Sequence, residues 1–81
     1  MRRYPGLDRA LTEALAKARE SAGLSQRELS SRLGRRNNFI QNIESRGQSV
    51  SASELHAIAC ECGTTGAELL KRAVRASKRK W

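Results

Sequence analysis

The stretch Leu24–Glu44, which reads LSQRELSSRLGRRNNFIQNIE, determines how this chain folds. Ser25 and Glu28 match the S/T-x-x-E capping box, in which the serine accepts a backbone hydrogen bond and the glutamate reaches back. Gly34 stands where a first short helix would end and the chain reverse. The seam between that helix and the next would consist of Leu29, Leu33, Ile40 and Ile43. The stretch therefore predicts two short helices joined by a tight turn.

The same helical punctuation continues through the rest of the chain. Ser51 and Thr65 each precede a glutamate by three residues, and Gly23 and Gly63 fall where helices would end. With apolar residues spaced three and four apart, these signals predict five helices. Their expected ranges are 8–22, 26–33, 37–45, 52–62 and 66–76. The predicted fold is all-α, with one compact domain over residues 8–76, a basic N-terminal arm over 1–7 and a basic C-terminal tail over 77–81.

Length and charge narrow the class of partner. Eighty-one residues suffice for one domain, and 16 Lys and Arg against 8 Asp and Glu give a net charge of +8. This balance favours a polyanion: nucleic acid first, an anionic membrane surface second. Residues 51–70 contain three acidic and no basic residues, whereas residues 71–81 contain six basic and no acidic ones. No apolar run is long enough for a membrane span or a signal peptide. A membrane-surface role lacks support as well, because the third expected helix is polar rather than amphipathic and basic, so no membrane partner is expected.

The third expected helix has an unusual outward face. It presents the carboxamides of Asn37, Asn38, Gln41 and Asn42, where a solvated helix would carry Glu and Lys. Carboxamides offer a donor and an acceptor together and can pair bidentately with adenine N6 and N7. In the alternative interpretation, the asparagine pair only caps the helix. We expect this helix to read base edges.

The stretch quoted above resembles the lambda-repressor-like (Xre-type) helix-turn-helix DNA-binding domains. Their shared pattern reads roughly L-[ST]-Q-x-E-L-A-x-x-L-G-…-I-x-x-[IL]-E, and the resemblance covers residues 8–74. It implies a five-helix lambda-repressor-like fold in which the third helix lies in the major groove and Gln26 contacts phosphate and braces that helix. We expect base contacts from Arg36, Asn37, Asn38, Gln41 and Asn42, and phosphate contacts from Gln26, Arg27, Arg35 and Arg46.

Two positions depart from the family's pattern. Arg35 occupies a turn position that is usually small or apolar, which favours a phosphate contact there. Arg46 stands where the family usually has glycine, and Gly47 follows it. Either Arg46 adopts a left-handed conformation or the third helix runs one residue longer.

The resemblance implies a sequence-specific, double-stranded DNA-binding transcriptional regulator. The simplest expectation is a homodimeric repressor of bacterial or phage origin that binds a palindromic operator, in the cytoplasm and associated with the nucleoid. A dimer interface is expected at Leu69, Leu70 and Val74, because the last helix is more apolar than one small core requires. Two alternatives stay open: the antitoxin of a toxin–antitoxin pair, with a toxin as partner, and the controller protein of a restriction–modification system.

Other candidate chemistry is weak. His56 and Cys60 lie four residues apart with Cys62 nearby, but no second such pair exists, so we expect packing rather than a metal site. No arrangement of nucleophile and base or of paired carboxylates suggests an enzyme, and no cofactor is expected. The basic run 71–80 is either a solvated tail or a second phosphate contact.

Overall fold

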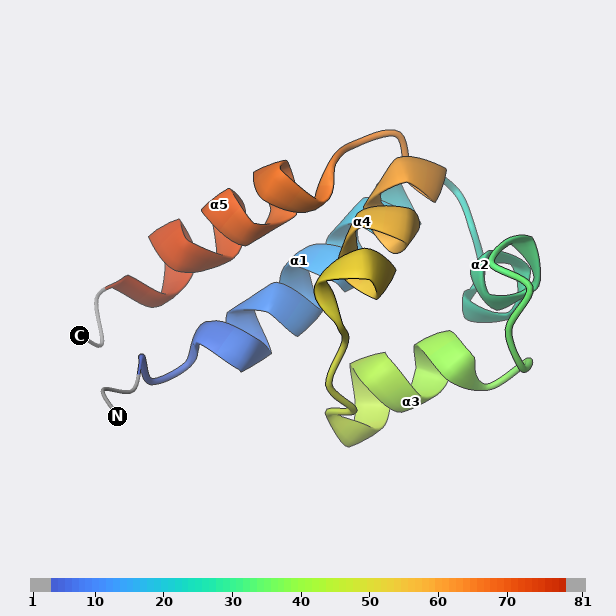
Figure 1. Cartoon of the computed structure of the whole chain (residues 1–81), viewed down its shortest axis with the longest axis horizontal. Coiled ribbons are helices and arrows are strands. Elements are labelled where there is room, and N and C mark those ends of the chain that lie inside the picture. Colours follow the sequence, from blue (N-terminus) through green and yellow to red (C-terminus); the bar gives the residue numbers. More distant parts are fainter. Residues whose placement is uncertain (1–3, 79–81) are drawn as a thin grey trace.

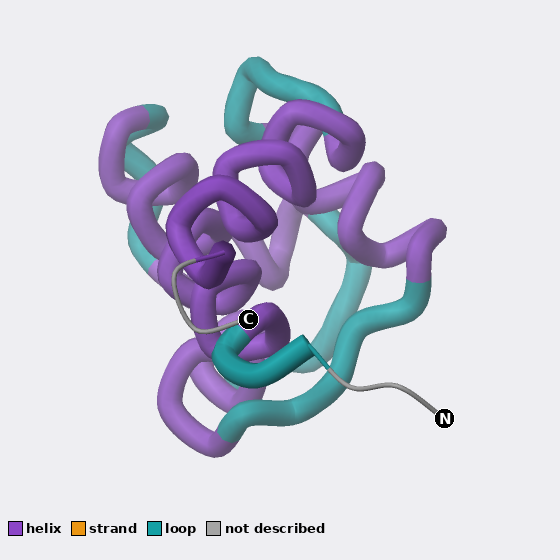
Figure 2. The backbone as a smooth tube through the Cα atoms, turned by 90° about the vertical axis from the view of Figure 1, so that its left-hand side faces the viewer, coloured by secondary structure: helices purple, strands orange, loops and turns teal. Residues whose placement is uncertain are grey.

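Five helices account for most of the chain, as the sequence predicted. The computed structural model describes residues 4–78, and within them the chain consists of helices joined by loops, without strands (Figures 1 and 2). The helices are α1 (Leu7–Ser21), α2 (Gln26–Arg32), α3 (Phe39–Arg46), α4 (Ala52–Glu61) and α5 (Gly66–Ser77). The all-α prediction is confirmed. None of the described helices is both long and apolar enough to cross a membrane.

The helix starts follow the capping signals. At α2, the Ser25 hydroxyl accepts from the Glu28 N–H at 3.0 Å and the Glu28 carboxylate accepts from the Ser25 N–H at 2.9 Å. Ser51 and Glu54 form the same box at α4. At α5, the Thr65 hydroxyl accepts from the Glu68 N–H at 3.1 Å, which is the hydroxyl half of the box. These local hydrogen bonds satisfy backbone N–H groups that have no acceptor in an uncapped helix.

The two capping glutamates should make folding sensitive to acid. The Ser25 backbone N–H lowers the pKa of Glu28, and the Ser51 backbone N–H, helped by Arg35, lowers that of Glu54. A lowered folded-state pKa stabilises the fold above the unfolded value, about 4.3, and the gain is lost as pH falls through the folded value. We therefore expect urea titrations to show a smaller acid-induced loss of stability for a Glu28→Gln/Glu54→Gln variant than for the wild type. Equal losses would contradict this account.

The core is shared by all five helices. α5 lies alongside α1 and α4, while α2 and α3 pack together on the other side of the molecule (Figure 1). Leu29 of α2 and Leu69 of α5 are both 0% exposed. The other buried helical apolar side chains are Leu15, Ala18, Phe39, Ile40, Ile43, Ile58, Ala59 and Ala73. Because α2 and α3 reach this common core, their orientation is fixed relative to the whole domain.

Several boundaries differ from the prediction. α3 begins at Phe39, so Asn37 and Asn38 lie in the turn before it and not inside the helix. The predicted seam between the two short helices omitted Phe39, which is only 6% exposed and whose burial anchors that turn. α1 begins at Leu7 and α5 ends at Ser77, whose side chain is buried, so the folded domain exceeds the predicted range 8–76 by one residue at each end. Residues 1–3 of the predicted arm and 79–81 of the predicted tail lie outside the described residues.

The end of α3 decides between the two conformations considered for Arg46. The helix runs through Arg46, and Gly47 takes the left-handed conformation with φ 70°. In the described chain only glycines have positive φ. The longer helix is therefore correct, and Arg46 forms part of the last turn of α3 without the steric cost of a left-handed backbone.

Candidate nucleic-acid interface

The first turn of α3 is held by a serine on α2. Ser30 is fully buried; its hydroxyl donates to the Gln26 carbonyl at 2.9 Å and accepts from the Ile40 N–H at 3.1 Å. Ile40 lies in the first turn of α3, where backbone N–H groups have no partner within the helix. The side chain of Asn38, at the N-cap position, makes no capping hydrogen bond. α2 thus caps α3, and the Asn38 carboxamide is left for other contacts.

The other end of α3 is fixed through Glu44. Its carboxylate accepts from Arg19 Nε at 2.7 Å, from Arg19 Nη2 at 3.0 Å and from Gln26 Nε2 at 2.8 Å. The Arg19 and Glu44 side chains are only 12% and 10% exposed, and Arg19 also donates to the Leu24 carbonyl. Bidentate, charge-assisted bonds of this kind are strong and directional. Gln26 therefore braces α3, as the resemblance implied, and α1, α2 and α3 are joined in one network.

The carboxamides border a shallow hollow between the starts of α2 and α3. Its volume is about 270 Å³, and its lining consists of Gln26, Arg27, Asn37, Asn38 and Gln41. Asn37, Asn38, Gln41 and the neighbouring Arg36 are exposed, and Asn42 is half-buried. The structure therefore brings together five of the nine residues expected to contact DNA, on an open surface formed by both helices. We call these five residues the reading surface.

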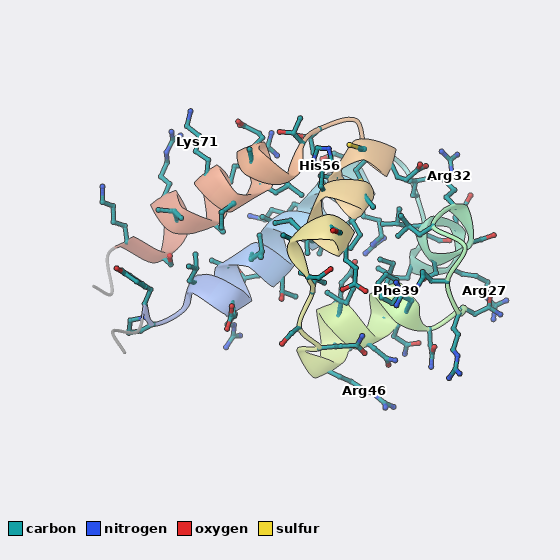
Figure 3. The ribbon with its side chains drawn as sticks, in the orientation of Figure 1. Arg27, Arg32, Phe39, Arg46, His56 and Lys71 are labelled. Atoms are coloured by element: carbon teal, nitrogen blue, oxygen red, sulfur yellow. The ribbon has the colours of Figure 1, made fainter. Side chains whose placement is uncertain are left out.

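The predicted phosphate contacts occupy different environments. Arg27 and Arg46 project away from the body of the molecule beside α2 and α3 (Figure 3). Arg35 instead turns toward α4: its Nη1 lies 3.0 Å from Glu54 Oε2, and its guanidinium lies 4.2 Å above the Phe39 ring. Arg35 thus fixes the turn before α3 against α4, a role that the sequence did not reveal.

Of the three residues predicted at a dimer interface, two remain available. Leu70 is 41% exposed and Val74 is half-buried, and they lie one turn apart on α5. Leu69 is 0% exposed and packs inside the core of this chain, so its assignment to an interface was wrong. Its position on the helix, one residue before Leu70, turns it inward.

His56 connects α4 to the start of α5, and the two cysteines lie near it at the end of α4. His56 Nδ1 accepts from the Gly66 N–H at 3.3 Å, and His56 Nε2 lies 3.4 Å from Cys60 Sγ. Burial raises the pKa of the Cys62 thiol above its usual value. In the described chain no three His, Cys, Asp or Glu side chains are grouped so that they could hold a metal ion. The hydrogen bond from Gly66 to His56 helps to position the start of α5.

Comparison with known proteins agrees with this geometry. The family model described as helix-turn-helix matches residues 15–69, from the middle of α1 into α5. The chain belongs to the lambda-repressor-like (Xre-type) helix-turn-helix family. It is a DNA-binding transcription regulator, of a family that is not typically enzymatic. No match was found among curated proteins or among solved structures.

Proposed function

We propose that this helix-turn-helix protein recognises a specific duplex sequence by placing α3 in the major groove. The observation that carries the proposal is the group of exposed carboxamides around the start of α3, on a helix fixed at one end by Ser30 and at the other by Glu44. A rigid support of this kind gives base-reading side chains a defined geometry. Asn and Gln can each pair bidentately with adenine, and Arg36 can reach guanine.

The charged residues around this surface would provide sequence-independent affinity. Arg27 borders the hollow together with the carboxamides, and Arg46 lies at the other end of α3; both side chains would contact phosphates beside the groove. Gln26, at the start of α2, and Arg35 would add phosphate contacts, the latter through N–H groups not used by Glu54. Base contacts then specify the sequence while phosphate contacts set the register.

We further propose that the protein acts as a homodimeric repressor, bacterial or phage in origin and cytoplasmic. Leu70 and Val74 supply an exposed apolar flank for a two-fold contact between copies of α5. A two-fold dimer would bind inverted half-sites one helical turn apart, about 34–36 Å, and repress by occluding a promoter. An antitoxin or a controller protein would use the same reading surface. A neighbouring toxin gene would favour the antitoxin, and a neighbouring methyltransferase or endonuclease gene would favour the controller protein.

Selection of duplexes from a random library tests specific recognition. We expect an enriched inverted repeat. Asn38→Ala should relax the preference at particular base pairs of that repeat, by about 1–3 kcal/mol, and leave the preference at the other positions unchanged. The matched variant Arg27→Gln should weaken binding to all sequences alike and reduce the salt dependence by about one phosphate contact. A library without an enriched motif, or a uniform effect of Asn38→Ala, would refute base reading by this surface.

A further inference from the structure

The outer side of α5 carries a basic stripe, which we define as Lys71, Arg75 and Lys78. The three residues are spaced by four and three positions, so they lie along one side of the helix, and all are exposed. In the described part of the chain no ion pair joins them to a carboxylate, whereas the neighbouring Arg72 pairs with Glu68 at 3.4 Å. The basic stripe is therefore a positive surface that no carboxylate among residues 4–78 neutralises by an ion pair.

The basic stripe lies far from the reading surface. α5 packs on α1 and α4, which separate it from α3 (Figure 1). Lys71 projects from one edge of the molecule, while Arg27 and Arg46 project from other edges, beside α2 and α3 (Figure 3). The buried residues Leu69, Ala73 and Ser77 face the core, so the stripe on the opposite side of α5 points away from it. A duplex held by α3 would therefore lie across α1 and α4 from these three cations.

The chemistry of the stripe fits a second polyanion better than a membrane. An interfacial helix must insert a broad apolar face into the lipid, but most of the apolar face of α5 is buried against α1 and α4, and only the narrow flank of Leu70 and Val74 is left uncovered. Lys and Arg side chains on an open surface can instead track phosphates without reading bases. Three such contacts are weak alone, but another segment of the same DNA molecule is present at high effective concentration.

We propose that the basic stripe of α5 binds the backbone of a second duplex, so that one molecule bridges two DNA segments. This inference rests on the proposed function, because α3 holds the first segment. Release of counterions from about three phosphates predicts that capture of the second duplex falls about 40-fold between roughly 50 and 200 mM salt.

A sandwich assay tests the bridge. The full chain is loaded on a biotinylated duplex held on beads, and capture of a second, fluorescent duplex is measured at low salt. The wild type should capture it, and the variant Lys71→Gln/Arg75→Gln/Lys78→Gln should not, although equal amounts of both proteins remain on the first duplex. A control that removes three exposed charges elsewhere, Arg9→Gln/Lys17→Gln/Arg32→Gln, should capture as the wild type does.

Other results would overturn the proposal in distinguishable ways. If the stripe variant captured the second duplex as well as the wild type does, the two α3 helices of a dimer would be holding the two duplexes. Loss of the first duplex by the same variant would mean that the stripe contacts the duplex already bound by α3. Stripe-dependent binding to phosphatidylserine vesicles without capture of DNA would identify a membrane surface instead. A second arm distinguishes this failure from that of the proposed function: the chain carrying Arg27→Gln/Arg46→Gln is attached to the beads directly. It should still bind the fluorescent duplex through the stripe, even if α3 does not read bases, and loss of that binding would overturn this inference.

Discussion

Replacing Glu44 by alanine is expected to lower the free energy of unfolding by about 3–5 kcal/mol, a large share of the stability of a domain this small. The carboxylate accepts three hydrogen bonds, two from Arg19 and one from Gln26, and little of it is exposed. Its removal leaves the Arg19 guanidinium in a poorly solvated position, where it keeps its hydrogen bond to the Leu24 carbonyl and a weak ion pair, at 3.9 Å, with the exposed Glu20 carboxylate. The cost therefore comes mainly from a charge left without its partner.

A double-mutant cycle distinguishes this network from an ordinary surface pair. Arg19→Met combined with Glu44→Leu should cost clearly less than the sum of the two single substitutions, because no charge is then left unpaired. The exposed pair Arg9–Glu13, at 3.4 Å, is the matched control, and Glu13→Ala should change stability by less than about 1 kcal/mol. Urea titrations followed by circular dichroism measure all of these. Additive costs in the cycle would show that Arg19 and Glu44 act independently.

The same cycle separates stability from function. The double variant leaves no charge unpaired, but it removes the acceptor that fixes the Gln26 side chain beside the hollow. We expect its affinity for the selected operator to fall more than its affinity for random duplex, since a loosened α3 costs base contacts before phosphate contacts.

Local signals in the sequence were enough to predict the helices and their order. The two complete capping boxes and the glycines after α1, α2 and α4 act within one turn of chain, so their positions could be predicted without knowing the tertiary structure. The start of α3 could not be predicted in this way. Its first turn is capped by Ser30, ten residues earlier and on another helix, and Phe39 is buried by the tertiary fold.

The network around Glu44 left a weaker signal. Glu44 follows Ile40 by four positions and Ile43 by one, and Arg19 stands in the same relation to Leu15 and Ala18. A charged residue next to the apolar face of a helix is expected to be partly buried and to pair with an opposite charge. Periodicity alone cannot show which residue carries that opposite charge. The outward-facing Leu70 and the inward-facing Leu69 illustrate the same limit, because two adjacent leucines differ only in what packs against them.

Substitution of Ser30 is the second change from which we expect a large effect. The family's pattern has a small residue at this position but does not show that its hydroxyl binds α3. Ser30→Val should destabilise the fold by about 2–5 kcal/mol: the added methyl groups overfill a site with 0% exposure, and the Ile40 N–H loses its acceptor. Ser30→Ala removes the hydroxyl without adding bulk and should cost about 1–3 kcal/mol. The exposed neighbour Ser31 provides the control, and Ser31→Ala should cost less than about 0.5 kcal/mol.

Measurements of DNA binding decide whether Ser30 positions the reading surface or merely stabilises the domain. Its hydroxyl links the Gln26 carbonyl to the first turn of α3, directly behind the turn that carries Asn37 and Asn38. At a temperature where Ser30→Ala is fully folded, we therefore expect its preference for the selected operator over random duplex to fall, while its affinity for random duplex stays near that of the wild type. Binding titrations on both duplexes measure the ratio. An unchanged ratio, with only the midpoint of unfolding lowered, would leave Ser30 a purely structural residue and would weaken the claim that anchoring of α3 by α2 sets the geometry of base reading.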